Sequence, residues 1–480
     1  MIHRTSHSFL LAAPVWLSLV SPLFAQFGES SYVVPLDDQT INYDKAKPND
    51  PITRLQQWIK DGKVTLENDK DHGFLPALLR ELKVPVSSQM LVFSKTSFQL
   101  RRISPSKPRA IYFNDDVYIG KVQDSDVIEI SAVDPNLGGV FYVLEPDADG
   151  KPRFERTADC LQCHASARTA GVPGHIVRSV FADGEGFPIF QAGSSVIDHR
   201  SPIEDRWGGW YVTGKSPHHG HLGNQTFSER ETERPDRTVG ANVTDLSKHF
   251  HTKPYLSPHS DIVALMVIEH QARMHNLITA VNYESKRAMA YQRVLNEALE
   301  QPMDTIGDTT KRRFKSASDA LLKYLLFVEE AELKGPIEGT SGFAEDFQKQ
   351  GPRDNKGRSL RELDLKTRLF RYPCSYLIHS EAFDAIDRPM RDYILQRLHD
   401  ILTRGRGSRG HSRHPARDEE GPARLLAREV AGISRESERS LYDPCHKERH
   451  HAIDSDSCRC TVPLRHADRL RFQREEHFTA

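Results

Sequence analysis

Residues 160–164 read Cys-Leu-Gln-Cys-His, and this C-x-x-C-H string constrains the chain more than any other feature. Two thiols three positions apart match the two vinyl groups of one haem, and the next histidine is then placed to ligate the iron. With 6 cysteines and 23 histidines in 480 residues, a chance occurrence is rare. The string predicts one covalent haem c, with Cys160 and Cys163 as thioethers and His164 as the proximal iron ligand.

The same cysteines have three other interpretations: a disulfide, half of a zinc site, or a redox pair. A structural zinc site needs a second pair of ligands at similar spacing, and the sequence holds no second C-x-x-C. A thioredoxin-like pair is typical of a strand-to-helix junction, whereas Asp159 and the small polar run 165–169 flank this one. Haem c is therefore the favoured interpretation, and the others stay open.

The N-terminus predicts export. Arg4 precedes an apolar stretch at 9–20, which is too short to span a bilayer comfortably, and small Ala25 follows. We interpret 1–25 as a signal peptide, with a retained membrane anchor as the alternative. Haem is attached to C-x-x-C-H outside the bacterial cytoplasm, so we expect a periplasmic or secreted protein. No later segment has 18 uninterrupted apolar residues, so no integral membrane segment is expected after cleavage.

Composition describes a polar but foldable protein, with 38% hydrophobic and 27% charged residues and a net charge of -1. A net charge near zero gives no reason to expect nucleic acid or an anionic membrane as partner. The expected partner is a redox protein or a small-molecule oxidant or reductant. Cysteines are too scarce for a disulfide framework.

The pattern of apolar residues predicts an α+β fold with an N-terminal antiparallel β region, a central irregular haem c-binding segment and a C-terminal helical region. We place these parts at 26–149, 150–259 and 260–403. Apolar runs divided by turn residues predict strands at 90–93, 97–101, 110–113, 117–120, 127–133 and 139–144. Helical spacing predicts helices at 52–61, 261–289, 309–334, 362–369 and 380–402.

The composition of the chain changes at residue 404 and stays different to residue 480. This tail has 15 arginines and one lysine, Lys447, and its apolar periodicity disappears. Two interpretations remain, a disordered basic tail and translation after a reading-frame shift. Neither predicts a packed core, so we do not treat the histidines and cysteines of the tail as ligands.

The sixth iron ligand separates an electron carrier from an enzyme, because a strong second protein ligand fills the coordination sphere. His270 lies on the apolar stripe of the helix expected at 261–289. His221 lies beside a Trp-rich string, and His175 follows a Gly/Pro loop. Each is a tentative distal ligand, and each has a plainer role as a hydrogen-bonded core histidine or a loop residue. Glu269 with His270 is also a candidate acid–base pair for an open distal site.

Three arginines, Arg156, Arg178 and Arg206, are candidates to pair with the haem propionates, because guanidinium groups bind carboxylates in a bidentate manner. Each alone is more commonly a surface charge. Trp207, Trp210 and Tyr211 are expected near the porphyrin or in the adjacent core.

Five strings carry a resemblance. They are CLQCH (160–164), GVPGH (171–175), RWGGWYVTG (206–214), HLGN (221–224) and SDIVALMVIEHQARMHN (260–276). Together they resemble a group of uncharacterised secreted bacterial cytochrome c-like proteins, over roughly residues 30 to 402. The resemblance implies haem c and export, and it supplies no activity. The group carries methionine where this chain has Leu222, and the tail does not resemble the group.

Two functions are compatible with these observations. The first is an exported monohaem c-type cytochrome that transfers single electrons. The alternative is a haem-dependent oxidoreductase, peroxidase-like, with an open distal site, or a haem sensor. Chain size favours the oxidoreductase, because about a hundred residues suffice to enclose one haem. The absence of a recognisable catalytic constellation favours the carrier, which we take as the expectation.

Overall fold

The computed structural model describes residues 33–404. The expected signal peptide at 1–25 lies outside the described residues, and so does the expected tail except for Arg404. Every helix within 33–404 is too short or too polar to cross a lipid bilayer.

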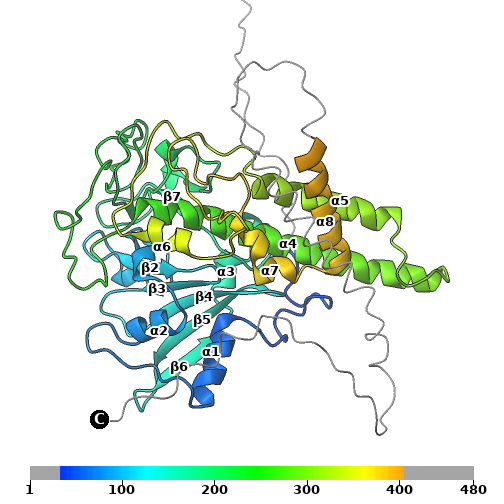
Figure 1. The fold of residues 1–480 in the computed structure, drawn as a ribbon. Helices are drawn as coiled ribbons and strands as arrows, with labels where there is room; N and C mark the ends of the chain where they lie inside the picture. The colour runs from blue at the N-terminus through cyan, green and yellow to red at the C-terminus, as the bar shows by residue number, and fades with distance from the viewer. Residues whose placement is uncertain (1–32, 405–480) are drawn as a thin grey trace, which may run out of the picture. The chain divides into compact units, whose positions relative to one another are not determined.

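The N-terminal half forms a seven-stranded antiparallel sheet in the order β6-β5-β4-β3-β2-β1-β9 (Figure 1). Its strands are β1 (Met90–Val92), β2 (Arg109–Phe113), β3 (Val117–Lys121), β4 (Ile128–Asp134), β5 (Gly138–Pro146), β6 (Pro152–Arg156) and β9 (Trp210–Tyr211). The first five strands match the expected ones to within two residues. The edge strands β6 and β9 come from the segment expected to bind haem, so that segment completes the sheet on both sides.

One face of the sheet is closed by two N-terminal helices, α1 (Pro51–Lys60) and α2 (Leu75–Glu81). Asp50 caps α1 by accepting from the main-chain N–H of Ile52 and Thr53, and its other oxygen accepts from Tyr142 Oη at 2.5 Å. Strand register places Tyr142 beside Ile130 on this face. The cap therefore also anchors the helix to the sheet.

The opposite face carries a row of directly paired residues, Phe113, Tyr118, Ser131 and Phe141. Side chains alternate between faces along a strand, so these four point the same way. This row lies beneath the haem-motif segment, because the Phe141 ring is 5.0 Å from the ring of His164.

The C-terminal half is helical, with α4 (Ile262–Ala298), α5 (Asp308–Leu325), α6 (Phe343–Lys349), α7 (Glu381–Asp384) and α8 (Arg388–Arg404). Figure 1 shows green α4 extending from the sheet toward α5 and α8, and α4 packs directly on α5. All residues of α4 from Ile262 to Thr279 are buried. The sequence predicted one buried stripe, whereas this part of α4 is enclosed on all sides. The α+β class is confirmed in outline, because the N-terminal half contains an antiparallel sheet and the C-terminal half is helical.

Two expected elements are wrong. Residues 97–101 form no strand, and Phe98 there is 69% exposed. Residues 362–369 form no helix, because Asp364 accepts hydrogen bonds from the N–H groups of Lys366 and Thr367 and so builds a turn. In addition, the helix expected at 380–402 is divided into α7 and α8.

Candidate haem-attachment site

The C-x-x-C-H string forms one helical turn. Cys160 is the N-cap of the short helix α3 (Leu161–His164), and the N–H of His164 donates to the Cys160 carbonyl at 3.0 Å. Buried Leu161 fixes the turn to the core, while Cys163 is exposed and Cys160 is half-buried. Both cysteines are free thiols. The turn therefore presents two thiols and one imidazole from five consecutive residues.

The imidazole of His164 is fixed in one tautomer. Its Nδ1 lies 2.9 Å from the carbonyl oxygen of Gly174. A carbonyl accepts only, so Nδ1 carries the proton and Nε2 carries the lone pair. Nε2 has no hydrogen-bond partner within residues 33–404. Burial lowers the pKa of His164 and so favours the neutral ring. Histidines that ligate metals typically donate their second N–H to a carbonyl in this way.

A tight loop returns the chain to that imidazole. The N–H of Gly174 donates to the His164 carbonyl at 2.8 Å, and Ala165 bridges to Pro173. Helix α4 holds the loop through Asn276, whose side chain accepts from the N–H of His175 and donates to its carbonyl. A Cβ on Gly174 would lie 2.2 Å from Asn276 Oδ1. The hydrogen-bonded position of Asn276 therefore favours glycine at residue 174.

Of the three arginines proposed from sequence, Arg178 is the one that interacts electrostatically with a motif residue, Cys163. Its pKa is lowered mainly by burial, and Cys163 is among the groups that act on it. Arg178 donates to Ser194 Oγ at 2.8 Å, and its buried Nε has no partner in the described part of the chain. Arg156 is bound to the carbonyls of Tyr43 and Ala46. Of these three arginines, Arg178 therefore keeps a buried donor group for a propionate.

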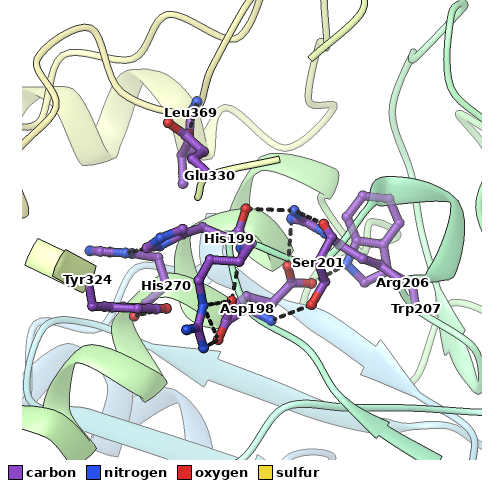
Figure 2. Close-up of polar contacts among 11 residues, drawn as sticks. Asp198, His199, Ser201, Arg206, Trp207, His270, Tyr324, Glu330 and Leu369 are labelled. Atoms are coloured by element: carbon purple, nitrogen blue, oxygen red, sulfur yellow. Dashed lines mark hydrogen bonds and ion pairs between the residues drawn. The ribbon is translucent and has the colours of Figure 1, made fainter. Parts of the chain in front are cut away.

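Arg206 and His270 belong instead to a buried polar cluster on α4 (Figure 2). Arg206 Nη1 donates to Glu269 Oε2 at 2.8 Å, and its other donors bind the carbonyls of His199 and Ser201. Trp207 Nε1 donates to the second oxygen of Glu269. Burial raises the pKa of Glu269 to about 7, against the lowering effect of Arg206 and Trp207.

The three tentative distal ligands are placed differently. His270 is fully buried and uses both ring nitrogens, with Nδ1 2.9 Å from Nδ1 of His199 and Nε2 2.8 Å from Ser375 Oγ. His221 Nδ1 accepts from the N–H of Gly223 at 3.1 Å. The contacts of both are explained without a metal. No described contact joins either ring to His164.

His175 is the tentative distal ligand that the fold brings to His164. Its ring is 4.3 Å from that of Tyr118 and 6.2 Å from that of Phe141, and its Nε2 is 2.6 Å from Ser131 Oγ. Because Gly174 binds Nδ1 of His164, the main chain at His175 passes beside Nδ1 rather than beside Nε2. His175 therefore directly follows the residue that accepts from His164, and its own buried Nδ1 has no hydrogen-bond partner within residues 33–404.

Sequence reasoning missed Arg109 and Glu129. They lie on β2 and β4, on either side of Gly120, and are paired at 2.6 Å. Both act on the pKa of Cys160, which burial raises to about 11. Strand alternation could have placed these two charges on one face, but their position beside Cys160 depends on how the motif packs on the sheet.

The chemistry of these residues fits a c-type haem. Within residues 33–404 no three His, Cys, Asp or Glu side chains are grouped to hold a bare metal ion. A haem brings its own four nitrogen ligands and needs from the protein only axial ones. Comparisons of the chain with protein-family models, with curated proteins and with solved structures find no match.

Proposed function

We propose that the chain is an exported monohaem c-type cytochrome that transfers single electrons in the periplasm or outside the cell. Cys160 and Cys163 hold haem c covalently, and His164 ligates its iron. The observation that carries the proposal is the hydrogen bond from His164 Nδ1 to Gly174, which leaves Nε2 as the free nitrogen of a motif that already predicts haem.

Each group in the site has a defined part. The helical turn holds the two thiols three positions apart on one element, and Gly174 orients the imidazole. Arg178 supplies a cation for a carboxylate at the edge of the site. Haem c, when bound, supplies the one-electron chemistry, and a redox protein or a small oxidant or reductant is its partner.

The test is the mass of the full chain, produced with a c-haem maturation system. We expect the polypeptide mass plus one haem. Replacing both motif cysteines, C160A/C163A, should abolish the covalent increment, whereas C374A should retain it, because Cys374 is buried elsewhere. Colourless protein after maturation, or pigment that acidified organic solvent extracts, would overturn the proposal.

A second function, a haem-dependent oxidoreductase with an open distal side, is favoured by the contacts of the tentative distal ligands. Both nitrogens of His270 are engaged by His199 and Ser375, and Nδ1 of His221 accepts from Gly223. The two functions differ in their response to carbon monoxide. Fast binding to the ferrous protein indicates an accessible sixth position and an enzyme or sensor, and an unchanged spectrum indicates a six-coordinate carrier.

A further inference from the structure

A second region of the fold has the features of a ligand site. A cavity of about 220 Å³ lies between the β2–β3 turn and the start of α7. The charged and polar residues that line it include Asp115, Asp116, Arg361, Tyr376, His379 and Glu381. None of these residues belongs to the haem motif. The cavity is small for a drug-sized ligand, which typically needs roughly 300 Å³ or more.

Arg361 carries a buried guanidinium that is only partly paired. It is 5% exposed and lies over the rings of Phe347 and Tyr376, at 4.7 and 4.3 Å. Nη2 pairs with the carboxylate of Asp115. Nη1 is buried and has no hydrogen-bond partner among the described residues. An unpaired buried donor costs stability, so this atom favours an acceptor from a ligand.

Asp116 is an acidic group of the same cavity that has no partner in the part of the chain that the structure describes. Its carboxyl group forms no hydrogen bond or ion pair with any residue of 33–404. Burial, with the nearby charges of Asp115 and Glu381, raises its pKa to about 7. Asp115 is occupied by Arg361, so Asp116 is the acidic group of the cavity that still lacks a cation.

We propose that this cavity binds a small zwitterion of the amino-acid class, with its carboxylate on Arg361 and its ammonium group toward Asp116. A simple anion would meet the charges of Asp116 and Glu381, and a simple cation would meet Arg361. A molecule with both charges close together satisfies both unpaired groups, and its size matches the cavity. This proposal does not depend on haem attachment.

Calorimetric titration of the full-length chain with glycine, L-alanine and L-glutamate tests the proposal. Acetate and methylammonium, which each carry one of the two charges, are the comparison ligands. We expect at least one amino acid to bind at least about tenfold more tightly than either single-charge ligand. No heat from any of the three amino acids at millimolar concentration, or equal binding of acetate alone, would overturn it.

Point variants distinguish a loss of ligand binding from a loss of folding. D116N should weaken amino-acid binding at least about tenfold and leave the circular dichroism spectrum unchanged, because it removes an unpaired group. D124N is the matched control, a carboxylate-to-amide change in the exposed turn between β3 and β4, and should bind as the parent does. R361K should also weaken binding; if it fails to fold, D116N still decides. Unchanged binding by D116N would refute the assignment.

Discussion

His164 Nδ1 and the carbonyl oxygen of Gly174 are 2.9 Å apart, and this one hydrogen bond determines which nitrogen of the ring is free. The bond closes the loop from residue 164 to residue 174, and Asn276 of α4 holds the end of this loop at His175. The orientation of the motif histidine therefore depends on a helix that begins almost a hundred residues later in the chain.

Gly174→Ala should disturb the site by moving Asn276. The added Cβ would lie 2.2 Å from Asn276 Oδ1, so the Asn276 side chain must move away from His175 or the loop must shift. We expect a loss of about 1–3 kcal/mol in the free energy of unfolding and less covalent haem per polypeptide. Gly184→Ala is the control, because nothing lies within 4 Å of its Cβ. Urea denaturation and the haem-to-protein absorbance ratio measure both effects, and equal behaviour of the two variants would contradict the prediction.

The two motif thiols should differ in reactivity before haem is attached. Cys163 is exposed, whereas Cys160 is half-buried and burial raises its pKa to about 11. The thiolate is the nucleophile, so at pH 8 iodoacetamide should modify Cys163 at least about tenfold faster than Cys160. Peptide mass spectrometry measures the two rates. Buried Cys374 should react slowest in the native chain, and faster labelling of Cys160 than of Cys163 would show that the turn is built differently.

His270→Ala should destabilise the protein without changing the haem spectrum. The substitution leaves a cavity in α4 and removes the partner of His199 and of Ser375, so we expect a cost of about 2–5 kcal/mol. Absorption spectroscopy of the matured ferric protein and urea denaturation are the measurements. A clear spectral change in a variant that remains folded would instead assign His270 as the distal ligand. His175→Ala, measured in parallel, tests the candidate that lies nearest to His164.

Glu269→Gln should alter how stability depends on pH. The pKa of Glu269 is raised to about 7 in the folded protein from an ordinary value of 4.5. An acid with a raised folded pKa contributes most stability below pH 4.5 and loses it as pH rises through 7. The free energy of unfolding of the parent, minus that of the variant, should therefore fall between pH 4.5 and 7, by at most about 3 kcal/mol.

Arg206 supplies the control for that measurement. Arg206→Met leaves the buried Glu269 carboxylate without its cation, and we expect a cost of about 3–5 kcal/mol near neutral pH. The cost should be smaller at pH 5, where Glu269 binds a proton. A pH-independent cost would show that the pair acts through packing alone.

Local patterns were sufficient for much of the fold. Five strands between Met90 and Pro146 were predicted to within two residues, because alternation and turn residues are local signals. The long helix α4 was predicted from the helical spacing of its apolar residues. That its residues from Ile262 to Thr279 are buried on every side was not predicted. Residues such as Glu269 and Gln271 are polar and yet fully buried. They are satisfied by partners from β3, from the segment around Arg206 and from Tyr376, and no local pattern encodes such partners.

The C-x-x-C-H string alone predicted the attachment chemistry, because two thiols and an imidazole within five consecutive residues need no distant residue to define them. The tertiary structure decided which group binds Nδ1 of His164. It also decided that Arg206 pairs with Glu269 and that Asp116 and Arg361 line one cavity. Hydrogen bonds and ion pairs depend on distances of about 3 Å between atoms that lie far apart in sequence. Only the folding of sheet, loop and helix against one another brings such atoms within reach.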